Sequence, residues 1–222
     1  MTINCIIQAR CTSKRFPNKV FKKIGTKNLI EILDLRLNKS KLIDNVIFAI
    51  PKNKKNIKLR NFLKKKNFNF FQGSENNVLK RIWDCSKKYN SKIIVRITSD
   101  CPLIDHNLVD HCITQFIKDK VSYLSSRDGT SLPDGLDVEV FDFKTLNKTY
   151  MEAKKRYDFE HVTSYITRNN SFKKKSLIIK IKNSYNKKLS IDNYSDLKRV
   201  KTIFKFFDNY TFSYKQLLNY LG

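Results

Sequence analysis

The chain has 222 residues and carries 45 Lys and Arg against 20 Asp and Glu, a formal net charge of +25. At this length one globular domain over residues 1–222 is expected, and 41% hydrophobic residues exclude a disordered polybasic tail. No apolar run approaches the roughly 20 residues that cross a bilayer. The first residues lack the pattern of a secretory signal. The sequence therefore predicts a cytoplasmic protein without membrane insertion.

The positive charge consists of 35 Lys and only 10 Arg. Clustered cations can bind nucleic acid by releasing counterions from phosphates, so a basic nucleic-acid-binding protein is one alternative. Specific phosphate and base contacts favour the planar Arg side chain, however, and scattered Lys is often solvated surface. No recognised nucleic-acid motif is present. Surface lysine is therefore the better explanation for most of the charge, and no specific nucleic-acid partner is expected.

The predicted elements alternate between short apolar runs and longer amphipathic patterns. The expected strands are 3–8, 46–50, 68–71, 93–97, 121–124, 138–143, 177–181 and a short one at 189–192. The expected helices are 29–37, 57–66, 78–89, 108–117, 143–155, 160–168, 197–207 and 214–221. Repeated β-α-β units predict an α/β fold of three layers around a mostly parallel sheet, whose ligands bind beyond the carboxyl ends of the strands.

The five cysteines include no Cys-x-x-Cys pair. Neither a disulfide framework nor a zinc site follows from this spacing. Cys85 and Cys112 fall within helical patterns and are predicted to be small core residues.

The loop at residues 9–19 follows the first strand directly. It combines four cations, Arg10, Lys14, Arg15 and Lys19, with two hydroxyl residues. Such a loop can surround a polyphosphate with charge-assisted bonds from side chains and backbone amides. It is neither a Walker loop nor a Gly-x-Gly-x-x-Gly turn, which disfavours ATPase and Rossmann interpretations.

Two further strand ends place single carboxylates at the same edge. Asp100 follows the buried strand at 93–97, and Asp192 ends the expected short strand at 189–192. Mg²⁺ prefers one or two carboxylates, water and substrate phosphate oxygens, so Asp100 is a metal candidate. Asp105 is better explained as a helix cap, and for Asp192 a metal ligand and a residue of the helix cap remain equal alternatives.

The segment 133–141 places Asp137 and Glu139 on one face of a strand. These acids could accept hydrogen bonds from the hydroxyls or amine of a sugar-like acceptor, or pair with Arg127, Arg156 or a partner subunit. His161 lies on a predicted helix, where a structural and a functional role remain open.

Together these segments resemble the sugar cytidylyltransferases, most closely the branch of spore coat polysaccharide biosynthesis protein F. That branch is similar to CMP-KDO synthetase and acylneuraminate cytidylyltransferase. The matching segments are spread over nearly the whole chain: Ile6-Ile7-Gln8-Ala9-Arg10 with Ser13, Arg15, Pro17 and Lys19, Gly73-Ser74-Glu75, Val78-Leu79-Lys80-Arg81, Val95-Arg96-Ile97-Thr98, Asp100-Cys101-Pro102-Leu103-Ile104-Asp105, Pro133 to Phe141, Glu160-His161-Val162-Thr163 and Leu189-Ser190-Ile191-Asp192 with Asp196-Leu197.

The sequence departs from the family pattern at three places. Phe16 replaces the usual Leu and keeps its bulk, and Asn18 replaces a common Gly but tolerates positive φ. Ser99-Asp100-Cys101-Pro102 replaces the Gly-Asp-Glu-Pro type of metal loop of the CMP-KDO branch, which disfavours KDO itself as the substrate.

The resemblance implies a nucleotide-diphospho-sugar transferase-like fold of the glycosyltransferase-A type. It also implies an Mg²⁺-dependent transfer of CMP from CTP to a sugar acid or related polyol, with release of pyrophosphate, in surface polysaccharide or lipopolysaccharide biosynthesis. The family often dimerises, so a homodimer is compatible with it. A homologue that binds nucleotide without catalysis is a further alternative.

The same resemblance implies a role for individual residues. Ala9, Arg10, Ser13, Lys14, Arg15 and Lys19 would bind the nucleotide through its triphosphate, with Ser74 and Arg81 beside the cytosine and ribose. Asp100 and Asp192 would bind Mg²⁺, and Arg10, Lys19 and Asp100 would carry catalysis. Asp134, Asp137, Glu139 and His161 would face the acceptor.

Overall fold

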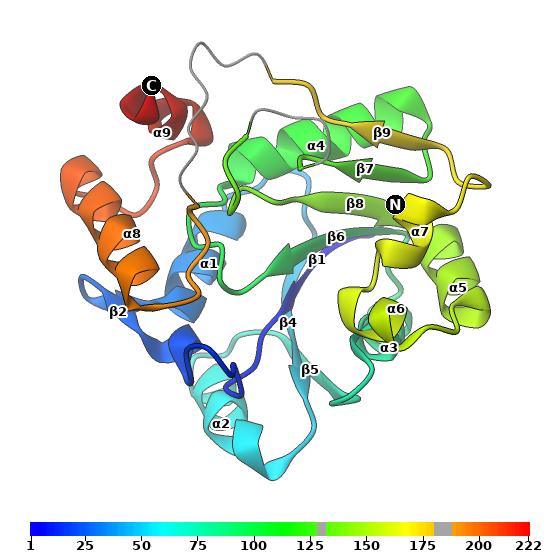
Figure 1. Ribbon diagram of the computed structural model, residues 1–222, viewed down its shortest axis with the longest axis horizontal. Helices are drawn as coiled ribbons and strands as arrows, with labels where there is room; N and C mark the ends of the chain where they lie inside the picture. The colour runs from blue at the N-terminus through cyan, green and yellow to red at the C-terminus, as the bar shows by residue number, and fades with distance from the viewer. Residues whose placement is uncertain (128–131, 180–187) are drawn as a thin grey trace.

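A seven-stranded sheet forms the centre of the protein (Figure 1). The computed structural model describes residues 1–127, 132–179 and 188–222. In this part of the chain the strands lie in the order β5-β4-β1-β6-β8-β7-β9. Their bounds are β1 Ile3–Gln8, β4 Asn45–Pro51, β5 Phe70–Gly73, β6 Ile93–Thr98, β7 Tyr123–Ser125, β8 Glu139–Asp142 and β9 Lys174–Ser176.

The sheet is mostly parallel. β1 pairs in parallel with β4 and β6, β4 pairs in parallel with β5, and β7 pairs in parallel with β9. β8 is antiparallel to its two neighbours, β6 and β7. Because β8 is antiparallel, its first residue Glu139 lies opposite Arg96, near the carboxyl end of β6. Residues distant in sequence are thereby brought to one edge of the sheet.

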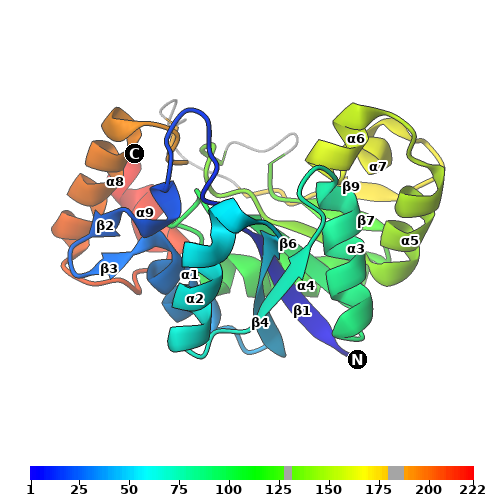
Figure 2. The same ribbon diagram turned by 90° about the horizontal axis from the view of Figure 1, so that it is seen from below.

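Helices cover both faces, so the protein has three layers (Figures 1 and 2). The helices are α1 Leu29–Leu37, α2 Ile57–Lys65, α3 Val78–Lys88, α4 His106–Asp119, α5 Phe143–Glu152, α6 Arg156–His161, α7 Ser164–Arg168, α8 Tyr194–Phe207 and α9 Tyr214–Leu221. Short 3-10 turns at Lys19–Phe21 and Lys54–Asn56 and the small hairpin of β2 Lys23–Ile24 and β3 Lys27–Asn28 complete the described elements.

The core divides into one cluster on each face of the sheet. Along β1, Cys5 and Ile7 face the cluster that contains residues of α1, α2 and α4, whereas Ile6 faces the cluster built on α3 and α5. This is the alternation expected of a strand that is buried on both faces. Cys85 and Cys112 are fully buried, as predicted for small core residues. The α/β fold expected from the sequence is confirmed.

Several predicted elements differ from the structure. The segment 160–168 is not one helix, because Val162 has φ 53° and ψ −59°, which separates α6 from α7. The strand expected at 177–181 lies earlier, at β9, and residues 180 and 181 lie outside the described residues. The segment 189–192 is not a strand: its backbone donates single hydrogen bonds to loop carbonyls rather than to a ladder.

The loop that follows β1 and the pair α6–α7 lie at the same edge of the sheet, on opposite sides of it (Figure 2). This is the edge at which the parallel strands end, where ligands bind in open α/β sheets. Among the described residues, no helix is both long enough and apolar enough to span a membrane.

Candidate active site

Lys19 is the centre of a buried ionic network at this edge. Its Nζ lies 2.7 Å from Asp100 Oδ2 and 3.1 Å from Asp192 Oδ1, and its side chain is only 10% exposed. Nζ also donates to the carbonyl oxygen of Ile191 at 2.9 Å. The last turn before Lys19 requires positive φ at Asn18, which has φ 55°. Three segments that are far apart in sequence therefore meet at one ammonium group.

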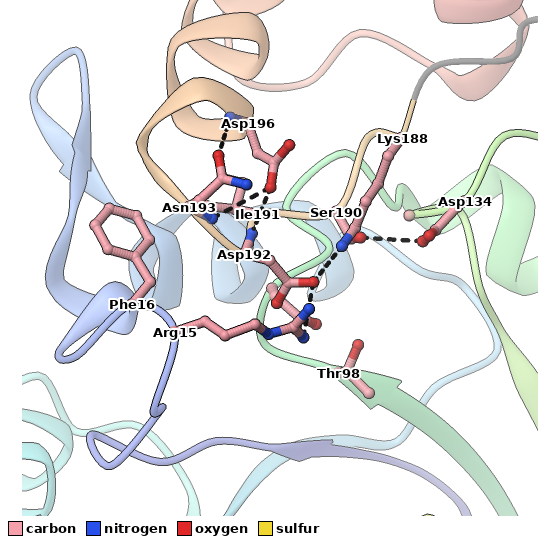
Figure 3. A network of polar contacts seen from close by, with 12 residues as sticks. Arg15, Phe16, Thr98, Asp134, Lys188, Ser190, Ile191, Asp192, Asn193 and Asp196 are labelled. Carbon is pink, nitrogen blue, oxygen red and sulfur yellow. Dashed lines mark hydrogen bonds and ion pairs between the residues drawn. The ribbon is translucent and has the colours of Figure 1, made fainter.

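Asp192 is shared among three cations (Figure 3). Arg15 Nη2 reaches one of its oxygens at 2.9 Å from the loop after β1, and Lys188 contacts the same oxygen from the opposite side. The carboxylate is not the helix cap that the sequence left open as an alternative. Asn193 caps α8 in a capping box with Asp196, and Asp196 also accepts the backbone N–H of Asp192 at 2.9 Å.

The loops that carry the two carboxylates are joined through their backbones. Ile191 N–H donates to the carbonyl oxygen of Asp100 at 2.8 Å. Leu189 N–H donates to the carbonyl oxygen of Asp134, whose side chain accepts from Ser190 Oγ at 3.0 Å (Figure 3). Asp105 caps α4, as predicted, by accepting the N–H of Leu108. Asp100, Asp134 and Asp192 thus belong to one connected unit.

Burial and charge act in opposite directions on these acids. Burial alone would raise the pKa of Asp100, but the Lys19 ammonium outweighs it and lowers the pKa below its usual value. For Asp192, burial is likewise outweighed by hydrogen bonds from Lys188 and Lys19, and the pKa is lowered. Both carboxylates are therefore ionised at neutral pH. No group of three or more His, Cys, Asp or Glu side chains in the described residues is arranged to hold a metal ion.

Arg81 and Ser74 form a second group, beside the carboxyl end of β5. The Arg81 side chain is buried, and its Nη1 donates to the carbonyl oxygen of Ser74. Its Nε has no hydrogen-bond partner among the residues that the structure describes. Burial, with help from the nearby Arg10 charge, lowers the pKa of Arg81 to about 10. Gly73 leaves this arginine room, since a Cβ there would lie 2.9 Å from Arg81 Cγ.

The remaining residues of the loop after β1 are more open. Arg10 and Lys14 are exposed, and neither contacts Asp100 or Asp192 in the described structure. Ala9 is buried and its N–H donates to Ala49 O, whereas Ser13 Oγ accepts the N–H of Phe16. The cations of the loop therefore differ in mobility. Lys19 is held in place at the end of the loop, whereas Arg10 and Lys14 reach into solvent.

Asp137 lies between the carboxylate unit and β8. Burial raises its pKa to about 6, Arg127 opposes this rise, and the charge of Asp134 adds to it. Its nearest hydrogen-bond donor is Gly135 N–H at 3.4 Å. Asp134 is exposed, so the pair presents one open and one half-buried carboxylate at the strand edge.

Glu139 has most of its hydrogen-bonding capacity occupied. Oε1 accepts from Tyr123 OH at 2.7 Å and from Thr163 Oγ1 at 2.6 Å, and Oε2 pairs with Arg96. Burial alone would raise the pKa of Glu139, but the Arg96 charge and the hydrogen bonds from Thr163, Tyr123 and Arg96 together outweigh it, and the pKa is lowered. Arg96 also donates twice to Gln8 Oε1, at 3.1 and 2.8 Å. The sequence left open whether Glu139 faces an acceptor or pairs with Arg127, Arg156 or a partner subunit. Its ion pair is instead with Arg96.

His161 ends α6 beside a turn of unusual geometry. Its exposed ring stacks on Tyr157, with ring centroids 4.2 Å apart. The next residue, Val162, is the centre of a γ-turn closed by Thr163 N–H donating to His161 O at 2.5 Å. Positive φ at a fully buried β-branched residue costs about 1–3 kcal/mol, and the surrounding contacts must compensate for it.

Comparisons with known proteins agree with this geometry. The family model described as cytidylyltransferase matches residues 4–218. The chain belongs to the cytidylyltransferase family. It resembles a cytidylyltransferase structure from Leptospira borgpetersenii, with a TM-score of 0.93 and 30% identity over 99% of this chain and 93% of the other.

Two curated proteins are similar to this family member in sequence. An uncharacterized protein of Methanocaldococcus jannaschii is 37% identical over all of this chain and 90% of its own length. Spore coat polysaccharide biosynthesis protein SpsF of Bacillus subtilis is 31% identical over 72% of this chain and 68% of its own length. The resemblance to the sugar cytidylyltransferases is therefore confirmed at the level of the family, and the protein is a nucleotidyltransferase.

Several residues that contact Asp192 or Glu139 in this cytidylyltransferase were not predicted from the sequence. Lys188 was not singled out, although it follows the i,i+4 spacing of a helical ion pair with Asp192. Gln8, Arg96 and Thr163 were noted only as members of matching segments. Gln8 ends β1 and Arg96 lies within β6, and polar residues in such buried strands could have been recognised as partners for a buried acid.

Proposed function

We propose that the protein transfers CMP from CTP to a sugar acid or related polyol, with release of pyrophosphate, in the biosynthesis of a surface polysaccharide. The observation that carries the proposal is the convergence of Lys19, Asp100 and Asp192 beside the basic loop at the strand edge. The family identity supports CTP as the donor. The similarity to a protein named for spore coat polysaccharide biosynthesis supports the sugar acceptor.

The loop after β1 would bind the triphosphate of CTP. Arg10 and Lys14 are exposed, and 72% of the Arg15 side chain is exposed although it contacts Asp192. These three cations can turn toward phosphate oxygens without crossing the core. When the acceptor oxygen bonds to the α-phosphorus, the bond to pyrophosphate breaks, and positive groups around the leaving pyrophosphate stabilise its charge. Lys19, fixed at the end of the loop, would hold its position through that change.

Asp100 and Asp192 fit a divalent cation by their chemistry. Both are ionised carboxylates held against one ammonium group, and Mg²⁺ favours one or two carboxylates completed by water and phosphate oxygens. We propose that these two residues hold Mg²⁺, which would neutralise phosphate charge and polarise the phosphorus when bound. Asp196 and Lys188 orient Asp192 for that role from two sides.

Asp134 and Asp137 would contact the acceptor. Asp134 is exposed and its side chain accepts from Ser190 Oγ, and Asp137 is half-buried and accepts from Gly135 N–H. A carboxyl whose pKa lies at about 6 can accept the proton of an attacking hydroxyl near neutral pH. We place His161 at the far side of the acceptor, at the end of α6. Glu139 would act through Thr163 rather than by direct contact.

The nucleic-acid alternative has less support. It would favour one continuous stripe of Lys with exposed aromatic residues, whereas Arg15, Lys19 and Lys188 converge on carboxylates at a strand edge. Only an activity assay distinguishes the proposed enzyme from a homologue that binds nucleotide without catalysis.

The proposal is tested by pyrophosphate release from CTP. The purified protein is incubated with CTP, Mg²⁺ and a panel of acidic sugars and polyols. We expect release only with an accepted sugar, loss of release in EDTA, and recovery when Mg²⁺ is returned. CTP should also raise the melting temperature. The proposal is overturned if no acceptor supports release and CTP gives no thermal shift.

Asp100→Asn and Asp119→Asn form a matched pair of variants. Both remove one carboxylate that pairs with a lysine, but Asp119 pairs with Lys175 at the end of α4. We expect Asp100→Asn to lower kcat at least about 100-fold, as loss of a charged group at the reacting phosphate does. Asp119→Asn should retain wild-type activity. Equal activity of the two variants would exclude Asp100 from catalysis.

A further inference from the structure

The γ-turn at Val162 is held by two buried carboxylates, one on each side. On the helix side, Asp158 is fully buried, pairs with Arg168 through both of its oxygens and accepts from Ser164 Oγ at 2.7 Å. On the sheet side, Thr163 Oγ1 donates to Glu139 at 2.6 Å. A turn that is unfavourable by itself is thus fixed at both ends by charge-assisted hydrogen bonds.

The sheet-side contact continues across three neighbouring strands. Glu139 of β8 lies opposite Arg96 of β6, and Arg96 donates to Gln8, the last residue of β1. Gln8 directly precedes the basic loop that begins at Ala9. A single chain of hydrogen bonds therefore links the base of this loop to the turn after α6, across the edge seen in Figure 2.

We infer that Thr163 and Glu139 are positioning residues that fix the 161–163 turn and thereby the place of His161. Neither residue needs to touch substrate. The main-chain reversal at Val162 ends α6 at His161, and without it α6 and α7 would continue as the single helix that the sequence pattern predicts. The link from this turn to the acceptor rests on the proposed function. The link from Thr163 to the position of His161 does not.

Two hydroxyls on the same carboxylate oxygen provide a matched comparison. Thr163 Oγ1 and Tyr123 OH both donate to Glu139 Oε1, at 2.6 and 2.7 Å. Thr163→Val and Tyr123→Phe each remove one of these donors with almost no change of shape. Only Thr163 belongs to the turn, so only Thr163→Val should release it. Thr163→Ser keeps the hydroxyl and should behave as wild type.

The position of His161 can be read directly by NMR. The chain has three histidines, so protein labelled with ¹³C-histidine gives few ring signals, and His161→Gln identifies those of His161. His161 is the last residue of α6 and its carbonyl oxygen accepts the N–H of Thr163, so its signals report the turn as well as the Tyr157 ring 4.2 Å away. We expect Thr163→Val to shift these signals and Tyr123→Phe to leave them in place. The inference is overturned if Thr163→Val leaves them unchanged or if Tyr123→Phe moves them equally.

Kinetics then test the link to the acceptor. With an acceptor found in the panel, we expect Thr163→Val to raise its KM about tenfold, the effect of losing one hydrogen bond to a charged group, with the KM of CTP within twofold. Thr163→Ser should restore both constants. An equal rise in both KM values would overturn the positioning role.

The two hypotheses can fail separately. If the wild-type protein transfers CMP to no acceptor, the proposed function fails, while the NMR comparison still decides whether Thr163 fixes His161. If Thr163→Val does not fold, Glu139→Gln replaces it. That variant keeps the side-chain shape but weakens the contacts with both Arg96 and Thr163, and it should move the same His161 signals.

Discussion

Lys19→Met removes the ammonium group on which the two carboxylate loops meet. The Lys19 and Asp192 side chains are each 10% exposed and that of Asp100 is 24% exposed, so the cation and both acids are largely desolvated. Removing one partner of a buried ion pair costs about 3–5 kcal/mol, because the other charge is left uncompensated. Arg15 and Lys188 still neutralise Asp192, whereas no other ion pair of Asp100 is present in the described residues. We therefore expect a loss at the lower end, about 3 kcal/mol.

Chemical and thermal denaturation at pH 7 measure this loss. For a chain of this size, about 3 kcal/mol corresponds to a fall in melting temperature of roughly 6–12 °C. Lys80→Met is the matched control, because Lys80 forms an exposed i,i+4 pair with Asp84 and its removal should cost less than about 1 kcal/mol. Lys19→Met with Asp100→Asn should be more stable than Lys19→Met alone, since the uncompensated charge is then absent.

The pH dependence follows from the pKa of Asp100. In the wild-type protein this pKa is lowered, so Asp100 contributes stability above its unfolded value of about 4 and loses it as the pH falls further. Without Lys19, only the hydrogen bonds from Thr98 and the backbone oppose burial, so we expect the pKa of Asp100 to rise and the variant to gain stability as this carboxyl takes up a proton. The difference between the two proteins should be widest at pH 7 and narrow toward pH 4. A Lys19→Met protein as stable as Lys80→Met, or a difference that does not change with pH, would refute the reasoning.

Substitutions at three further positions test other parts of the structure. Arg36 is 1% exposed and donates to four backbone carbonyls, so Arg36→Met should destabilise the protein by about 4 kcal/mol in urea unfolding, with Arg36→Lys recovering only part. Gly135 has φ +107° and a Cβ there would lie 2.4 Å from Ser190 N, so Gly135→Ala should cost about 3 kcal/mol in thermal unfolding. The raised pKa of Asp137 means that wild-type stability falls as the pH rises from 4 through 6, and Asp137→Asn should remove up to about 3 kcal/mol of that fall.

The sequence predicted the central sheet well because its strands are buried on both faces. Residues 3–8 and 93–97 are mostly apolar, interrupted by Asn4, Gln8 and Arg96, and each range lies within one residue of the observed strand. β9 was missed because Lys174 and Lys175 are exposed at the edge of the sheet and carry no alternating apolar pattern. The break at Val162 was missed for a different reason. No Gly or Pro marks it, and it is held in place by a carboxylate of α6 itself, Asp158, and one of β8, Glu139.

The sequence predicted where single site residues lie but not the contacts between residues that are distant in sequence. Strand-end placement put Asp100 at the edge where ligands bind, because the fold rule for parallel sheets applies to each loop separately. For Asp192 the predicted strand was wrong, and a backbone hydrogen bond from Ile191 to Asp100 brings its loop to the same edge. Neither pattern could show that Lys19 bridges the two carboxylates, since these contacts join residues 81 and 173 positions apart. Glu139 illustrates the same limit. Its place on the strand was predicted, but its contact with Thr163 depends on how α6 and α7 pack against the sheet.

The pairing around Asp192 changes how the net charge of +25 relates to function. Arg15, Lys19 and Lys188 all contact this one carboxylate, so moving one of them away also removes its repulsion with the other two. A triphosphate can therefore draw Arg15 away at little cost, because two cations still neutralise Asp192. Lys19 differs, since it alone pairs with Asp100 in the described residues and also holds Ile191 O. The proposed catalytic cycle thus separates an exchangeable cation at the loop tip from a fixed cation at its end.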